Sequence, residues 1–102
     1  MSYAVVDNVK TILQIDEKAE FWDDEIESNL TSAESLVDAY VKKAGLPTVS
    51  NPPAQMVVDA CAFYAASLFR KPRDEVSAKL FFEKAEELMA KYVGSLNLGY
   101  LR

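Results

Sequence analysis

The sequence predicts an all-α protein: a small four-helix domain with a buried third helix and an extended C-terminal tail. Apolar residues recur at helical spacing in four stretches of the 102-residue chain. Proline, glycine and capping residues lie between these stretches, where helices start and end. A chain of this length forms one domain with a single core, which we place in residues 1–93, followed by an interaction tail in residues 94–102.

The third helix is the element around which we expect the fold to form. Its stretch, PPAQMVVDACAFYAASLFR (52–70), carries one charge before its terminal arginine, Asp59, and has apolar residues on nearly every side of a helical wheel. Asn51 and the two prolines after it suit a helix start, and Pro72 marks the end. A small, weakly polar stripe remains, made of Gln55, Asp59, Ala62 and Ala66. We expect this stripe to face solvent, with a subunit contact as the alternative.

Two further helices are predicted in the first half of the chain. Apolar spacing indicates a helix over 3–14, capped by Ser2, and the charged segment Asp16–Trp22 lacks periodicity, which predicts a loop. The next helix is expected to run from Asp23 or Asp24 to Ala44, with Gly45 as its left-handed cap. Its heptad pattern consists of Ile26, Leu30, Ala33, Val37, Tyr40 and Ala44.

Phe21 and Trp22 are two large aromatic residues directly before the second helix. Our preferred interpretation is a hydrophobic staple that fixes the entry of this helix against the core. The alternative is an exposed aromatic anchor for a partner, because aromatic residues often dominate the binding energy of interfaces.

The second helix is preceded and opened by an acidic patch. Between residues 16 and 34 the only cation is Lys18. The carboxylates are Asp16, Glu17, Glu20, Asp23, Asp24, Glu25, Glu27 and Glu34. The patch lacks the alternating ligands and turn glycine of a calcium loop, so we interpret it as a solvated charge run rather than a metal site. Such a surface repels DNA at short range and selects a basic partner.

A fourth helix is predicted over Asp74–Val93, after the basic cluster Arg70-Lys71-Pro72-Arg73. Cations and a proline are typical of a helix end, which is sufficient to explain this cluster. The apolar side of the fourth helix is expected to consist of Val76, Leu80, Phe81, Ala85, Leu88, Met89, Tyr92 and Val93. Phe82 interrupts the polar side and is interpreted either as a core-edge residue or as a docking point.

The last nine residues differ from the rest of the chain. Leu96, Leu98, Tyr100 and Leu101 are too apolar for a free tail, whereas Gly94 and Gly99 each disfavour a continuing helix by about 1 kcal/mol relative to alanine. Apolar residues at alternate positions suit an extended segment that adds to a partner's sheet edge or lies in a groove. The alternative is a tail folded back over its own core.

The composition excludes several kinds of chemistry. The chain has no histidine, which removes the commonest general base and transition-metal ligand. Cys61 is the single cysteine, so no internal disulfide forms, and its apolar neighbours indicate a buried thiol. A net charge of −5 argues against a broad grip on nucleic acid. The sequence has no membrane-length apolar run and no signal-peptide pattern, so we expect an intracellular protein. Because the residues needed for common catalytic sites are missing, we also expect a non-enzymatic protein with no catalytic residues, metal or cofactor.

Three segments together resemble the head-tail connector, or adaptor, family of tailed bacteriophages and related proviruses. They are VKTILQID (Val9–Asp16), DDEIESNLTSAESLVDAYV (Asp23–Val41) and PPAQMVVDACAFYAASLFRKPR (Pro52–Arg73). In that family a short helix ends in an Ile-Asp type motif, an acid-rich turn leads into a long helix, and a proline-started apolar helix closes near an arginine. The chain departs from the family in its longer last helix and in lacking the glutamate that often follows the arginine.

The resemblance implies a structural virion protein that forms a homo-oligomeric ring beneath the portal and extends the DNA channel toward the tail. The implied partners are the portal protein and a tail-completion or stopper protein, and DNA passes nearby without specific binding. The implied location is the head-tail interface of the virion, with host cytoplasm during assembly and no membrane. The alternative is a small cellular helical module that binds one protein, such as a regulatory or antitoxin-like dimer.

Two groups of candidate contact residues follow. The predicted portal contacts are Leu96, Leu98, Tyr100, Leu101 and Arg102. The predicted subunit interface pairs a basic and aromatic group with the acidic patch of a neighbour. Its residues are Phe82, Arg70, Lys71 and Arg73 on one side and Asp23, Asp24 and Glu27 on the other.

Overall fold

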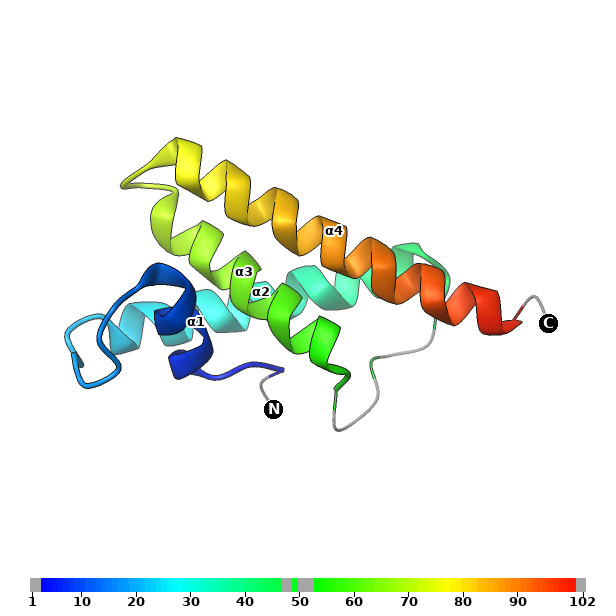
Figure 1. The fold of residues 1–102 in the computed structure, drawn as a ribbon, viewed down its shortest axis with the longest axis horizontal. Coiled ribbons are helices and arrows are strands. Elements are labelled where there is room, and N and C mark those ends of the chain that lie inside the picture. The colour runs from blue at the N-terminus through cyan, green and yellow to red at the C-terminus, as the bar shows by residue number, and fades with distance from the viewer. Residues whose placement is uncertain (1–2, 47–48, 50–52, 101–102) are drawn as a thin grey trace.

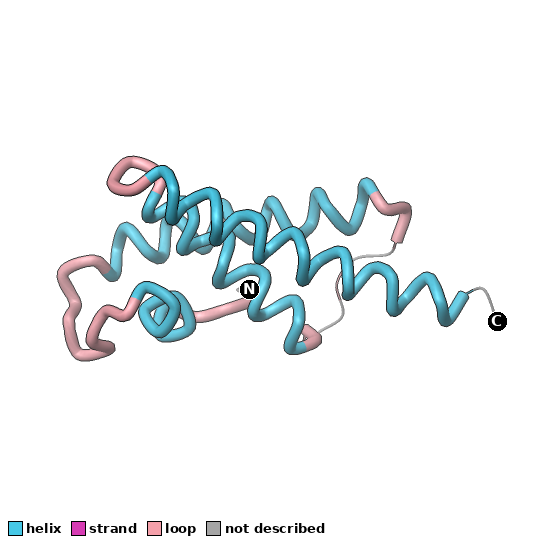
Figure 2. The backbone as a smooth tube through the Cα atoms, turned by 45° about the horizontal axis from the view of Figure 1, so that its top comes forward, coloured by secondary structure: helices cyan, strands magenta, loops and turns pink. Residues whose placement is uncertain are grey.

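The computed structural model confirms the all-α fold with four helices. It describes residues 3–46, 49 and 53–100, with the backbone alone for 96–100. The helices are α1 (Val6–Leu13), α2 (Asp23–Lys43), α3 (Gln55–Arg70) and α4 (Glu75–Tyr100), and the described part of the chain contains no strand. The molecule is elongated, with extents of 48 × 27 × 18 Å, and the α3–α4 hairpin runs along much of its length (Figures 1 and 2).

The third helix lies at the centre, as predicted, because α1, α2 and α4 all pack against it (Figure 1). Val57, Cys61 and Tyr64 are fully buried on α3. The predicted solvent exposure of its small stripe is wrong for Ala62 and Ala66, which are both buried. Small side chains let neighbouring backbones approach closely, and α1 packs against α3. Gln55 stays exposed and Asp59 is half-buried, so only the second half of the stripe is buried, and this burial occurs within one chain.

Helix α2 follows the predicted heptad pattern for its first three turns and then departs from it. Leu30, Ala33 and Val37 are buried, but the next buried residue is Val41, while Tyr40 is half-buried and Ala44 is exposed. A straight α-helix drifts by about 20° per heptad, which moves the core position one residue onward. The predicted cap is confirmed, since Gly45 has φ +76° and its N–H donates to the Lys42 carbonyl at 3.0 Å.

Helix α1 is shorter than predicted and begins at Val6. The Val5 N–H donates to the Asn8 side-chain oxygen at 2.8 Å, which satisfies one backbone group at this end. The proposed cap, Ser2, lies outside the described residues. Tyr3 instead marks the described start of the chain, and its hydroxyl donates to the Asp38 carboxylate on α2.

A buried lysine organises the loop between α1 and α2. Lys10 lies on α1 with a side chain that is 2% exposed. Its Nζ lies 2.7 Å from the Asp23 carboxylate and donates to the carbonyls of Glu17 at 3.0 Å and Ala19 at 2.7 Å. The two carbonyls accept hydrogen bonds from the ammonium group, and the carboxylate lies at ion-pair distance, so the buried charge is compensated. The loop therefore folds around one charge.

The predicted extended C-terminal segment is wrong for the backbone, because α4 continues through residue 100. Each further helical residue adds a hydrogen bond to a nucleus that already exists, and this offsets the modest cost of glycine. At Gly94 a Cβ atom would meet nothing within 4 Å, so packing does not require glycine there. No break in the backbone separates the domain from the predicted tail at residue 94.

Asp74 caps the start of α4. The Ser77 N–H donates to its carboxylate at 3.2 Å, and the Ser77 hydroxyl donates to the other carboxylate oxygen at 2.7 Å. These hydrogen bonds favour the ionised form and lower the pKa of Asp74 below its ordinary value of 3.8.

We expect the Lys10→Met variant to lower the free energy of unfolding by about 2–4 kcal/mol, because it leaves two carbonyls and a carboxylate without their donor. Urea denaturation followed by circular dichroism measures this loss. Lys18→Met, at an exposed lysine of the same loop, is the matched control and should leave stability unchanged. Equal stability of the two variants would show that Lys10 does not hold the loop.

Asp74→Ala should destabilise the protein at neutral pH, and the loss should depend on pH. Because the folded-state pKa is lowered, the ionised cap stabilises the wild type above the ordinary value of 3.8, and this advantage disappears as the pH falls through the folded-state value. Urea midpoints between neutral and acidic pH should therefore converge at low pH. Glu83→Ala, on the outer side of α4, should show no such convergence.

Candidate interaction surface

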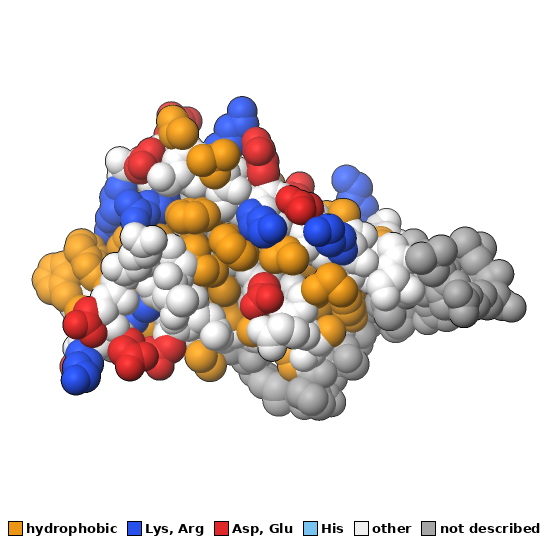
Figure 3. Space-filling model, in the orientation of Figure 1, with side chains coloured by type: hydrophobic (Ala, Val, Ile, Leu, Met, Phe, Trp, Pro, Cys, Tyr) orange, Lys and Arg blue, Asp and Glu red, His pale blue; other side chains and the backbone are white. Residues whose placement is uncertain are grey.

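An open groove of about 490 Å³ lies between the end of α3 and the start of α4. Its main lining residues are Leu68, Lys71, Glu75, Val76, Lys79 and Phe82. At its floor the Ser67 hydroxyl donates to the Ala78 carbonyl at 2.7 Å, which holds the two helices together. Figure 3 shows hydrophobic side chains gathered over α3 and α4, with charged side chains around them.

The groove carries exposed apolar surface. Val76 is 72% exposed and Phe82 is 39% exposed. The Phe82 ring packs edge-on against the buried Tyr64 ring, with 5.3 Å between centroids. Phe82 is therefore a core-edge residue whose ring also borders the groove, and its role as a docking point stays a prediction.

Val76 and Leu80 correct the prediction for α4, which placed both on the apolar side. Both are exposed, while Ala78, Ala85 and Met89 are buried. Two residues along a helix correspond to a rotation of about 200°, so residues 76 and 80 lie on the side opposite Ala78. Leu80 does not line the groove, although it lies one turn after Val76.

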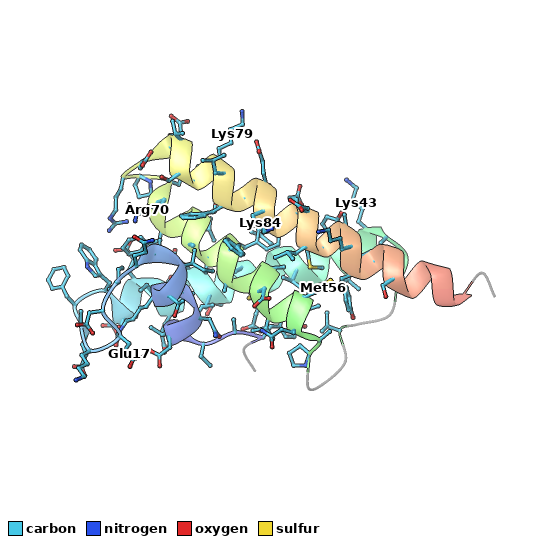
Figure 4. All side chains as sticks on the ribbon, viewed as in Figure 1. Glu17, Lys43, Met56, Arg70, Lys79 and Lys84 are labelled. Carbon is cyan, nitrogen blue, oxygen red and sulfur yellow. The ribbon has the colours of Figure 1, made fainter. Side chains whose placement is uncertain are left out.

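Two lysine side chains lie at the rim of the groove. Lys71 and Lys79 are both exposed, and Figure 4 shows Lys79 pointing away from the body on the outer side of α4. Glu75 is the one carboxylate among the lining residues. The rim is therefore more positive than the rest of this acidic protein, and it suits an occupant that carries carboxylates beside an apolar group.

Phe82 and Lys71 both line the groove. The two arginines of the predicted interface instead make hydrogen bonds within the chain. Arg70 lies near α1 (Figure 4), and its Nη2 donates to the Leu13 carbonyl at 3.4 Å. Arg73 places two nitrogens 2.8 Å from the Glu25 carboxylate oxygens, and this hydrogen bonding raises its pKa. Its Cζ lies 4.1 Å from the Phe69 ring centroid.

The acidic side of the predicted interface is divided in the same way. Asp23 pairs with Lys10 within the chain, whereas Asp24 and Glu27 are exposed.

The two aromatic residues before α2 differ in their surroundings. Trp22 packs edge-on against Phe69 with 5.5 Å between ring centroids, as the staple interpretation predicts, whereas Phe21 is 83% exposed and its role as an anchor stays a prediction.

A second hollow, of about 450 Å³, lies between α2 and α4 and includes Tyr40, Lys43 and Val93 in its lining. Near it the Tyr64 hydroxyl donates to Glu86 at 2.8 Å. Burial, followed by this hydrogen bond, raises the pKa of Tyr64. The phenol therefore stays protonated, and its hydrogen bond links α3 to α4.

Three of the five predicted portal contacts belong to the last turns of α4. Residues 96, 98 and 100 belong to the helical backbone, and their side chains lie outside the described part of the chain, as do Leu101 and Arg102 entirely. The last turns of α4 project beyond α2 and α3 in both views (Figures 1 and 2). The groove and this end therefore lie at opposite ends of α4.

The described residues contain no group of three or more acidic or cysteine side chains placed to hold a metal ion. None of the helices in the described part of the chain is both long and apolar enough to cross a membrane. Cys61 is fully buried, and desolvation, followed by the fields of Glu34 and Asp38, raises the pKa of its thiol to about 12.

Comparison with family models, with curated proteins and with solved structures finds no match to this chain.

Sequence patterns identified only part of this surface. Phe82 and Lys71 were candidates because one breaks a polar side and the other belongs to a basic cluster. Val76 and Lys79 were missed as groove residues. The available signal was the turn Arg70–Asp74, which brings the end of one helix against the start of the next.

Cys61 should react only when the protein unfolds. At about pH 8 a thiol with its pKa near 12 is ionised to about one part in 10⁴, and the buried sulfur is also shielded from reagents. A chromogenic disulfide reagent should therefore label the native protein very slowly and the guanidinium-unfolded protein at once. Rapid labelling of the native state would show that the thiol is accessible.

Proposed function

We propose that the protein is a non-enzymatic head-tail connector subunit, which forms a ring on a phage portal and extends the DNA channel toward the tail. The viral part of this proposal rests on the three segments that resemble the connector family. Their helices are present in the observed order, with the acid-rich turn between α1 and α2 and the arginine at the end of α3. This agreement supports the proposal at the level of architecture.

One geometric observation carries the assembly part of the proposal. The small domain has two unlike surfaces on α4. An apolar groove lies at the start of the helix. The other end of the helix projects from the body (Figure 1). A subunit that bridges a ring and a portal needs different surfaces for different neighbours, because head-to-tail contacts join unlike patches. The groove suits a neighbouring protein, and the apolar C-terminal residues suit the portal.

The non-enzymatic part rests on the side chains available for chemistry. The chain has no histidine, and its one thiol is sealed in the core. The groove offers lysines, one glutamate and apolar side chains, which suit binding rather than bond cleavage.

The second candidate function is a cellular helical module that binds one protein. The groove favours it as well, because about 490 Å³ of open apolar space accommodates a few side chains of a single partner helix. This candidate requires no projecting helix end and no ring.

A tagged pull-down from cells that produce the virus, with mass spectrometry, tests the proposal. The wild type should capture a portal or tail-completion protein. Deletion of residues 95–102 should abolish portal capture while the protein stays folded, because the buried Met89 and Tyr92 precede the cut. Capture that survives the deletion would contradict the assigned contacts. A single cellular protein in equal amount would favour the binding module.

A further inference from the structure

We propose that the groove between α3 and α4 takes Phe21 of a second copy of this chain. This contact would join the subunits of the proposed connector. Only the closure of the subunits into a ring rests on the proposed function. It names one aromatic side chain as the inserted group and one groove as its receptor.

Phe21 is the most exposed large hydrophobic residue in the described part of the chain, at 83%. It lies in the loop that Lys10 holds, one residue before Trp22, and its ring packs edge-on against Trp22 at 4.6 Å between centroids. The loop is thus held by Lys10 before Phe21 and by Trp22 after it. Binding of the exposed Phe21 ring to a partner would therefore cost little further conformational entropy. An aromatic side chain held in this way is typical of an interface anchor.

The groove has the complementary properties. Val76 and Phe82 expose apolar surface on its walls, and a volume of about 490 Å³ exceeds the size of one phenyl ring. Ser67 at the floor already donates to the Ala78 carbonyl, so the interior does not require a polar occupant there. An aromatic group therefore fits the groove better than a charged one.

The charges around the two surfaces are also complementary. Phe21 lies between the exposed carboxylates Glu20 and Asp24, and Lys71 and Lys79 stand exposed at the groove. Insertion of the phenyl ring brings the two signs together, which fixes orientation and speeds association at low salt. A second copy thus supplies both the apolar group and the carboxylates that the groove suits.

The two surfaces lie on different sides of the end of α3. Trp22, beside Phe21, packs on Phe69, whereas Leu68 and Lys71 line the groove. One copy can therefore insert its own Phe21 into one neighbour while its groove receives Phe21 from another. Such a head-to-tail contact produces rings or open filaments.

Two variants test this contact. Phe21→Ala removes the inserted group and keeps the groove. Val76→Glu keeps the inserted group and places a carboxylate in the groove, against the neighbour's own carboxylates. Residue 76 is largely exposed and lies in the first turn of α4, where an acidic residue suits the helix, so the variant should fold. Leu80→Glu and Leu80→Ala, one turn away and outside the groove, are the matched controls.

Sedimentation equilibrium should find that wild type and both Leu80 variants form oligomers. Phe21→Ala and Val76→Glu should each weaken association by about 30-fold, the loss expected for an interface anchor. Mixing the two variants should restore a 1:1 complex, because one keeps a functional groove and the other a functional Phe21. A wild type that stays monomeric up to about 1 mM, or a mixture that does not associate, would overturn the proposal.

The portal pull-down separates this proposal from the proposed function. Portal capture with a Phe21→Ala protein that still oligomerises would leave the connector function standing and overturn this contact. Restored pairing in the mixture without portal capture would support the contact and contradict the connector function. A wild type that stops at a dimer would support reciprocal insertion of Phe21 and contradict the ring.

Discussion

The rest of the structure depends on the buried ammonium group of Lys10. Its partners are two carbonyls in the middle of the loop and the carboxylate of the first residue of α2, so the position of α1 determines where α2 begins. The start of α2 in turn places Trp22 against Phe69 and Glu25 beside Arg73 at the end of α3. Taking a charge out of water is costly, and the nearby carboxylate and the two hydrogen bonds offset that cost in this arrangement.

The hairpin of α3 and α4 is held by a small number of polar links across an otherwise apolar contact. Ser67 joins the two helices near the turn, and Tyr64 joins them farther along through Glu86. Asp74 fixes the first turn of α4 by capping it. These links keep the helices close at their floor while leaving the groove open above it.

The proposed contact surfaces lie at separate sites. Phe21 lies in the loop before α2, and residues of α3 and α4 line the groove. The end of α4 projects from the body (Figure 1). Surfaces that do not overlap can be occupied at the same time, which an assembly of many subunits requires. The internal pairs of Arg73 and Asp23 remove two charges from the contacts that the sequence suggested, and they leave Lys71 and Asp24 exposed instead.

The sequence by itself determined the elements whose signals are local. The left-handed turn at Gly45, the acidic start of α2, the cap at Asp74 and the burial of α3 all follow from backbone preferences and apolar spacing. Phe82 was found because it interrupts a regular pattern. The helical C-terminus was missed because the cost of two glycines is small compared with the gain from extending an existing helix.

Only the tertiary structure decided which side chains are buried and which meet. Lys10 has the sequence signature of a surface residue, and only the fold of the following loop brings the carbonyls of Glu17 and Ala19 to its ammonium group. Ala62 and Ala66 are equally compatible with solvent or core until the packing of the other helices on α3 buries them. Val76 lines the groove because the turn after α3 brings the end of that helix beside it. In each case the deciding contact is made by tertiary packing or by the path of a loop, and local helix propensity carries no information about it.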